Sequence, residues 1–597
     1  MSKFCRPSGL GRMPLGISSL ILRVAPLAAG VSLGCSANAT RPGGHANPNA
    51  SDPAGTNGSG GPSASGGTGS IGTLGTGGGT GTVAMGTGGG GSTAATCAPG
   101  AALAPARVWL LTDEQVVKVV GDVLGATLSD ADAQITTASG ITGNYTNLSE
   151  AFQVDAPAAQ GYQRAAIKVA QQIKPCGATV TPACVEQFVN DAIAKAWRRP
   201  LLATETAALM KIYNDFSPSE GPDEALSMLI QAALQSGSFL YRTEIGTDAS
   251  QATAPVALTS NEVASALSFL LLDSAPDAEL WSKANSGTLL QTDVLKGEVD
   301  RLLAVPRTRD ELSELVGYWA GVELIPFRTK DPTLFPEYTD SVRAAAYAGT
   351  GAFLKDVMWN GKFSDLFTSR KVYATSELAT VYGLPAVAGT GLVPVDVPAS
   401  QPAAGLLTQP GLLAATNKRA AKGDPIHRGI FLYNSFVCGG TVPAPPAAAL
   451  DVSKSMMGTE RELSQQRAAL PTCAGCHSLF DPLGLPFEQF DPMGRFKLTD
   501  ANGIAIDPSS TLAGLGADLD GPVTGVTDLA QRLASRRATA DCATKTLGKY
   551  SLGFSAAVDS CDLTHARDTF AGSGSFADFF RTLLTAPGFV VRDPVLK

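Results

Sequence analysis

Apolar residues recur at helical spacing through most of the chain. The clearest run covers residues 185–197, where apolar side chains follow the i, i+3, i+4, i+7 pattern. Thr112 with Gln115 and Thr259 with Glu262 have the spacing of a capping box, and each pair precedes another such run. Further helical runs cover residues 225–235, 340–358 and 526–533. Strands do not alternate with helices in this pattern, so we predict a mainly α fold of serial helical domains.

Polar or Gly- and Pro-rich gaps interrupt the helical pattern near residues 247–255, 385–402 and 441–446. These gaps divide the body of the chain into four predicted parts. They are an N-terminal helical domain over 101–250, a central helical domain over 255–390, a third domain over 400–500 and a C-terminal helical domain over 501–597.

The first 35 residues have the layout of an export signal. Four basic residues lie before or at the start of a short apolar run over 24–33, which is too short to cross a bilayer as a mature helix. The segment 32–35, Ser-Leu-Gly-Cys, resembles a bacterial lipoprotein cleavage box, in which Cys35 becomes acylated. Ordinary cleavage after residues 37–39, Ala-Asn-Ala, is the alternative. We expect an exported protein, in the periplasm or on the outer surface, that a lipid on Cys35 anchors to a membrane.

Residues 36–100 form a Gly-, Ser- and Thr-rich segment. Of the 65 glycines in the chain, 21 lie between Arg41 and Gly100, and this composition buries too little apolar area to offset chain ordering. We predict a disordered tether. The formal charge of −8 would become −12 without the basic leader, and no polybasic stretch is present, so a nucleic-acid partner is disfavoured.

Residues 473–477, Cys-Ala-Gly-Cys-His, carry the strongest chemical signal. C-x-x-C-H is the attachment motif of a c-type haem: Cys473 and Cys476 would form thioethers with one porphyrin, and His477 would be the proximal axial ligand of the iron. A thioredoxin-like redox pair, a zinc site and a disulfide between the two cysteines are the alternatives. We predict one covalent haem c.

The sixth position of the iron has no clear candidate in the sequence. Weak candidates are Met493, His427, His565, Met456 and Met457. For Met493 we favour core packing. The acidic residues Asp481, Glu488 and Asp491 have the composition of an acid/base or cation site, but we interpret Asp481-Pro482 and Asp491-Pro492 as the starts of two turns around the haem edge.

The other cysteines suit an oxidising compartment. Cys176 and Cys184 flank a short Pro-containing loop, and Cys542 and Cys561 flank another local segment, so each pair could close a disulfide. Cys97 and Cys438 then remain and could pair with each other. Sequence alone leaves this connectivity open.

The haem motif and several other segments resemble one family of large exported bacterial proteins of unknown function. Members of this family carry planctomycete-type cytochrome c domains and are also frequent in myxobacteria. The resembling segments are 196–200, 237–242, 334–337, 378–383, 405–409, 427–429, 471–477, 480–484, 487–491, 494–496, 506–507, 529–530 and 550–553. The resemblance covers about 107–592 and implies a serial multidomain protein with one covalent haem. Many members carry a His shortly before the haem cysteines, where this chain has Gln466-Arg467, and Gly553-Phe554 replaces the usual Gly-Arg.

Three functions remain open at this point. The first is electron transfer between unidentified redox partners at the cell envelope; the second is a haem oxidoreductase with an open distal face. The third is a non-haem surface binding or scaffold protein. No Ser/His/Asp order, P-loop or HExxH pattern indicates a hydrolase or a nucleotide enzyme, so we favour a redox carrier over an enzyme.

Overall fold

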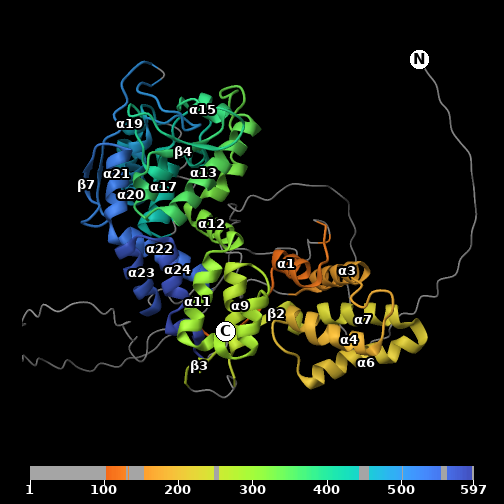
Figure 1. Ribbon diagram of the computed structural model, residues 1–597. Coiled ribbons are helices and arrows are strands. Elements are labelled where there is room, and N and C mark those ends of the chain that lie inside the picture. The colour runs from red at the N-terminus through yellow and green to blue at the C-terminus, as the bar shows by residue number, and fades with distance from the viewer. Residues whose placement is uncertain are drawn as a thin grey trace, which may run out of the picture. The chain divides into compact units, whose positions relative to one another are not determined.

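The computed structural model confirms a mainly α architecture (Figure 1). The residues that it describes are 103–129, 132, 154–247, 254–440, 442, 456–500, 502–552 and 561–594. The predicted leader and tether, with Cys35 and Cys97, lie outside these residues. The predictions for that part of the chain are therefore not tested.

The N-terminal part contains a helical layer and the first strand pair. Its elements are β1 (Arg107–Leu110), α1 (Asp113–Leu124), α3 (Ala156–Gln172), α4 (Pro182–Phe188), η2 (Val189–Ile193), α5 (Ala194–Ala196), α6 (Ala203–Glu220), α7 (Pro222–Leu234), α8 (Gly237–Leu240) and β2 (Tyr241–Glu244). The capping box predicted at Thr112 and Gln115 is present at the start of α1. The helical run predicted over 185–197 continues through a π-helical turn, η2, between α4 and α5.

The central part is also helical. Its elements are β3 (Val256–Ala257), α9 (Ser260–Leu271), α10 (Ala278–Asn285), η4 (Thr288–Leu290), α11 (Thr292–Leu303), α12 (Pro306–Ala320), η5 (Val322–Phe327), α13 (Asp340–Asn360), α14 (Asp365–Thr368), β4 (Lys371–Ala374), α15 (Ser376–Tyr382) and β5 (Val393–Asp396). The predicted capping box of Thr259 and Glu262 begins α9. The carboxylate of Glu262 also accepts hydrogen bonds from the backbone N–H groups of Ile245 and Gly246, and this links the chain that follows β2 to the start of α9.

The last third of the chain contains the haem motif and the C-terminal helices. Its elements are η6 (Gly405–Thr408), α16 (Pro410–Thr416), α17 (Pro425–Leu432), η7 (Tyr433–Val437), α19 (Glu460–Ala469), α20 (Pro471–Gly484), η8 (Leu485–Phe487), β6 (Ser510–Leu512), β7 (Gly521–Val523), α21 (Val526–Ser535), α22 (Arg537–Leu552), α23 (Cys561–Ser573), α24 (Phe576–Leu584), η9 (Pro587–Val590) and β8 (Val591–Arg592).

Each sheet of the described residues is a two-stranded antiparallel ladder. The pairs are β1–β2, β3–β8, β4–β5 and β6–β7. In the first ladder Arg107 lies opposite Glu244 and Trp109 lies opposite Arg242. The second ladder returns the C-terminal strand β8 to β3, the strand just before α9.

Three clusters of buried apolar side chains form the core. The helices between α1 and α8 share one cluster, to which Phe269 and Ala275 of the central part also belong. A larger cluster runs from Leu258 to Phe589 and combines side chains of the central part with those of the last third. A smaller cluster surrounds β4, α15 and Met493. These apolar clusters each contain side chains from more than one predicted domain, so they do not mark the domain limits. Those limits stay a prediction.

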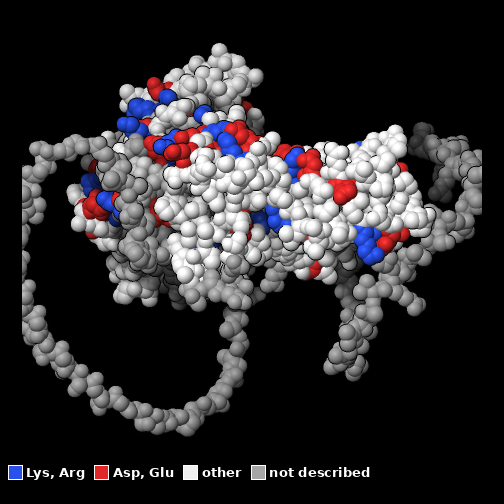
Figure 2. All heavy atoms as spheres, turned by 60° about the horizontal axis from the view of Figure 1, so that its bottom comes forward, with Lys and Arg blue, Asp and Glu red and all other residues white. Residues whose placement is uncertain are grey.

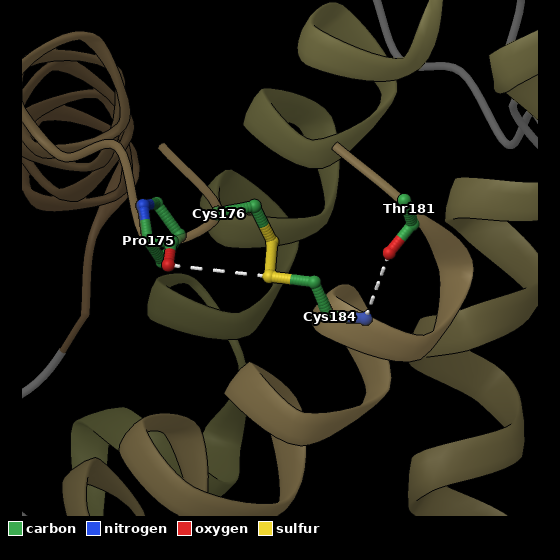
Figure 3. The surroundings of a disulfide bond; sticks show 4 residues. All are labelled: Pro175, Cys176, Thr181 and Cys184. Atoms are coloured by element: carbon green, nitrogen blue, oxygen red, sulfur yellow. Dashed lines mark hydrogen bonds between the residues drawn. A yellow bond between two sulfur atoms is a disulfide. The ribbon is translucent and has the colours of Figure 1, made fainter. Parts of the chain in front are cut away.

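Two disulfides are present among the described cysteines. Cys176 and Cys184 are bonded, as the sequence suggested (Figure 3). The Oγ1 of Thr181 accepts a hydrogen bond from the backbone N–H of Cys184 at 3.3 Å and thereby caps α4 over the same short loop. The carbonyl oxygen of Pro175 lies 4.0 Å from the Sγ of Cys184, which is a contact only, because a disulfide sulfur carries no proton.

The second disulfide corrects the predicted connectivity. Cys542 bonds to Cys438, so neither Cys542–Cys561 nor Cys97–Cys438 forms. The physical reason is long-range packing, because α22 lies against η7 and brings Cys542 within 3.3 Å of the carbonyl of Ser435. The side chain of Cys561 is not among the described ones.

The described surface is mixed in charge on the face shown in Figure 2, where basic and acidic side chains lie in common groups separated by uncharged surface. Within the described residues, no helix is both long and apolar enough to cross a membrane.

Candidate functional site

The haem motif lies on α20, which begins with Pro471 at its first position. The residues Cys473, Cys476 and His477 occupy positions i, i+3 and i+4, so their side chains lie on one helical face. Both thiols are free: Cys473 is buried and Cys476 is exposed. The disulfide alternative for this pair is therefore not formed.

His477 is oriented by a buried carboxylate one turn further along α20. Its Nδ1 lies 2.8 Å from Oδ1 of Asp481, and Asp481 is fully buried. A carboxylate is an acceptor, so Nδ1 donates in this hydrogen bond, and in the neutral imidazole with this tautomer the lone pair is on Nε2. Nε2 has no hydrogen-bond partner among the described residues. The nitrogen that would coordinate an iron is the one left available.

Arg467 of α19 holds Asp481 in place. The Nε and Nη2 of Arg467 lie 2.8 and 2.7 Å from Oδ2 of Asp481, and Arg467 is only 4% exposed. Removing either partner would leave an uncompensated buried charge, which typically costs about 3–5 kcal/mol. The Arg467–Asp481–His477 series therefore fixes both the tautomer and the ring orientation of His477.

The interpretation of Asp481-Pro482 as a turn is wrong, because both residues lie inside α20. Pro482 lies in the last turn of α20 and cannot donate to the carbonyl oxygen of Ser478, so the helix continues past it with one hydrogen bond fewer. The Oγ of Ser510 donates to the carbonyl oxygen of Pro482 at 2.7 Å and links β6 to this helix end. The turn predicted at Asp491 is confirmed: its Oδ1 accepts from the backbone N–H of Met493 and of Arg495, each at 2.9 Å.

Glu488, the third acidic candidate, is half-buried, and burial raises its pKa to about 7. It follows η8 and forms no ion pair within the described part of the chain. The structure does not bring Glu488 and Asp481 into one carboxylate pair, since Asp481 is already bonded to Arg467 and His477.

The candidates for the sixth ligand lie in different surroundings. Met493 is fully buried in the smallest apolar cluster, where its carbonyl accepts a hydrogen bond from the hydroxyl of Tyr382; this agrees with core packing. Met457 is 84% exposed and Met456 half-buried, in the segment before α19. His565 is exposed on α23. None of these positions assigns the ligand, which stays a prediction.

The fifth candidate, His427, is bound to Asp424 at the start of α17. Its Nδ1 lies 2.7 Å from Oδ2 of Asp424. Burial alone would raise the pKa of Asp424, but hydrogen bonds and charge from His427 outweigh it and lower this pKa to about 2. His427 thus has the same Nδ1 arrangement as His477, on a helix that packs against α20.

The two residues after His427 explain how α17 supports the site. Arg428 is 1% exposed and donates to the carbonyl oxygens of Leu413, Phe487, Phe490 and Asp491, which fixes the chain that leaves α20. At Gly429 a Cβ would overlap the carbonyl oxygen of Phe480, so α17 and α20 approach as only glycine allows.

Sequence reasoning missed Arg467 and Arg428 as parts of the site, and it considered Asp481 as an acidic candidate and a turn residue but not as the partner of His477. The i, i+4 spacing of His477 and Asp481 was a usable signal, but it applies only if the helix continues past Pro482. Arg467 and Arg428 act through long-range contacts that no local pattern encodes. Among the described residues, no group of three or more His, Cys, Asp and Glu side chains is arranged to hold a bare metal ion.

Three segments of the chain match family models. Residues 184–244 match PSD5, a protein of unknown function (DUF1595); residues 258–384 match PSD4, a protein of unknown function (DUF1592). Residues 403–500 match PSCyt3, a protein of unknown function (DUF1588). These are planctomycete cytochrome c-like domain families of unknown function.

The cytochrome c-like segment 403–500 contains α16, α17, α19 and α20, and so includes both His427 and the whole haem motif. The family models therefore match three segments within the part of the chain for which the sequence showed the resemblance. No curated protein and no solved structure matches the chain.

The donor set fits a c-type haem. Two free thiols and one imidazole nitrogen share a helical face, and the second imidazole nitrogen is bound to a carboxylate in the way typical of axial histidines with a structured outer shell. Cys473 and Cys476 would hold the porphyrin, and Nε2 of His477 would bind the iron.

Proposed function

We propose that this protein is an exported c-type haem protein that transfers electrons between redox partners at the cell envelope. The observation that carries the proposal is the hydrogen bond from His477 to Asp481, because it leaves Nε2 available beside two free thiols. In attachment, each S–H would add across one vinyl group, so that an S–C bond forms and the hydrogen goes to the neighbouring carbon. When bound, the haem would supply a one-electron carrier.

The chain's own residues would do the rest. Asp481 would hold the Nδ1 proton throughout, so His477 would remain a neutral ligand in both oxidation states. Arg467 would hold Asp481 in place through a charge-assisted hydrogen bond. Membrane attachment through Cys35 is part of the same proposal and rests on the lipoprotein-like segment 32–35.

A pyridine haemochrome spectrum of the full chain, expressed in a periplasm with cytochrome c maturation, tests the proposal. We expect a covalent haem that survives denaturing electrophoresis and stains in the gel. The double variant Cys473→Ala/Cys476→Ala should lose it. The matched control is Cys176→Ser/Cys184→Ser, which also removes two sulfurs but should keep the haem. A purified chain without covalent haem would contradict the proposal.

Carrier and oxidoreductase are distinguished by the iron's coordination. A carrier should be six-coordinate, should bind CO slowly and should not turn over peroxide, because a filled coordination sphere reorganises little on changing charge. Rapid CO or cyanide binding with turnover of an electron donor would instead favour the open-site alternative. For the anchor, Cys35→Ser should abolish palmitate labelling and release the protein from membranes.

A further inference from the structure

A second site lies far along the chain from the haem motif, where β1 and β2 face α9 and α12. It is a cavity of about 250 Å³. That volume is below the range of about 300–1,000 Å³ typical of drug-sized ligands, so the cavity suits a small metabolite. Its walls differ sharply in charge.

One wall is cationic. Glu244 accepts hydrogen bonds from Arg592 at 2.6 Å and from Arg107 at 2.8 Å on one oxygen, and from Arg242 at 3.3 Å on the other. All four side chains are less than 10% exposed. The single negative charge of Glu244 is smaller than the two positive charges of Arg242 and Arg592 together. This wall therefore carries an excess of positive charge.

Trp109 adds a hydrogen-bond donor to the cationic wall. Its ring is stacked between two guanidinium groups, with Arg107 at 4.2 Å and Arg242 at 4.1 Å from the ring centroid. The indole is 4% exposed and lines the cavity, yet its Nε1 has no hydrogen-bond partner among the described residues. A buried donor without a partner typically costs about 1–3 kcal/mol, and a ligand acceptor would remove this cost.

The opposite wall is acidic. The carboxylates of Asp273, which follows the end of α9, and of Glu311 in α12 both contact the single ammonium of Lys118, at 2.9 and 2.8 Å. Burial raises the pKa of both carboxyls, and Lys118 lowers it only in part. Arg307 is 4.0 Å from Glu311, but it is paired with Asp122 at 2.7 Å. This wall therefore has an excess of negative charge.

Apolar side chains lie between the two walls. Phe269, Leu315 and Phe589 line the cavity, and the ring centroid of Phe269 also lies 5.2 Å from the guanidinium carbon of Arg242. A molecule that fills such a space needs an anionic group, a cationic group and an apolar body. Each charged group would be held by a preformed cluster of opposite sign.

We propose that this cavity binds a free α-amino acid with an apolar side chain. Its carboxylate would face Arg242 and Trp109, and its ammonium would face Asp273 and Glu311. The site shares no residue with the haem motif, so it stands or fails independently of the haem.

Calorimetric titration of the full mature chain tests the proposal with L-valine, L-leucine and L-phenylalanine. For the amino acid that binds best, two analogues each remove one charge: the primary amide keeps only the ammonium, and the N-acetyl form keeps only the carboxylate. We expect each analogue to bind at least tenfold more weakly. Failure of all three amino acids to bind at millimolar concentration, or equal binding of the N-acetyl form, would overturn the proposal.

Two conservative variants assign the walls. Trp109→Phe keeps the ring and removes the donor, so it should weaken the amino acid and its N-acetyl form about tenfold but leave the amide unchanged. Glu311→Gln should weaken the amino acid and the amide but not the N-acetyl form. The control is Asp215→Asn, which removes an acid that is paired with Lys211 on the surface of α6. Equal weakening by this control would also overturn the proposal.

Discussion

At the scale of single residues, Asp481 decides how strongly His477 would donate to an iron. A carboxylate that accepts the Nδ1 proton makes the imidazole a stronger donor, and a stronger donor favours the oxidised metal. The backbone carbonyl or neutral amide in the same place would do this less. A substitution of Asp481 should therefore change the redox potential of the haem.

We expect Asp481→Asn to keep the covalent haem and to raise its midpoint potential by about 60–120 mV. This shift corresponds to a change of about 10–100-fold in the equilibrium between the oxidised and reduced states, at about 59 mV for each factor of ten in a one-electron couple. A potentiometric titration measures it. Asp491→Asn is the matched control, because Asp491 follows the same segment but its carboxylate accepts hydrogen bonds from Met493 and Arg495, not from His477. An unchanged potential in Asp481→Asn would show that the hydrogen bond does not tune the metal.

Glu323 offers a second test at the residue scale, through the pH dependence of stability. Burial raises its pKa from the ordinary 4.5 to about 7, and its Oε2 has no hydrogen-bond partner among the described residues. An acid whose pKa is raised on folding binds a proton more tightly in the folded state. Its unfavourable contribution is absent below pH 4.5, grows as the pH rises and is complete above about pH 7.

Glu323→Gln should therefore raise the free energy of unfolding at pH 8 by up to about 3 kcal/mol and leave it nearly unchanged at pH 4. Chemical unfolding at the two pH values measures the difference. Glu186→Gln, on the exposed side of α4, should have little effect at either pH. A gain that is equal at pH 4 and pH 8 would rule out ionisation as its cause.

At the scale of elements, the close approach of α17 and α20 depends on glycine. In Gly429→Ala the new Cβ would overlap the carbonyl of Phe480, so the helices must separate. We expect a loss of about 1–3 kcal/mol in the free energy of unfolding. Gly351→Ala in α13 meets no atom within 4 Å and should be neutral or slightly stabilising. Thermal unfolding monitored by circular dichroism compares the two; equal stability would contradict the packing argument.

The helices themselves were largely predictable, because their signals are local. The capping boxes at Thr112 and Thr259 each combine a cap and an apolar period within a few residues, and both begin helices where expected. The end of α20 was not predictable in the same way. Asp481-Pro482 has the local signal of a turn, whereas the ion pair with Arg467 of α19 favours one more helical turn. Because Asp481 was interpreted as a turn residue, its role as the hydrogen-bond partner of His477 was not predicted.

At the scale of the whole molecule, contacts between distant segments decide what local signals cannot. Cys176 and Cys184 are eight residues apart, and this short spacing made them a candidate pair that the structure bears out. Cys438 and Cys542 are 104 residues apart, and only the packing of η7 against α22 joins them. The charged cavity is likewise built from six separated segments, and no single one of them has a charge pattern that indicates a site.

This difference in separation predicts the relative contribution of the two disulfides. Chain-entropy arguments assign about 5 kcal/mol to closing a loop of roughly 100 residues and about 2–3 kcal/mol to closing one of roughly ten. Cys438→Ser/Cys542→Ser should therefore lower the urea midpoint more than Cys176→Ser/Cys184→Ser does. Trp319 is a suitable fluorescent reporter, because its Nε1 donates to the carbonyl of Ser435, next to the long-range disulfide. If the short-range variant is the less stable of the two, the segments around Cys438 and Cys542 are held by apolar packing rather than by the covalent link.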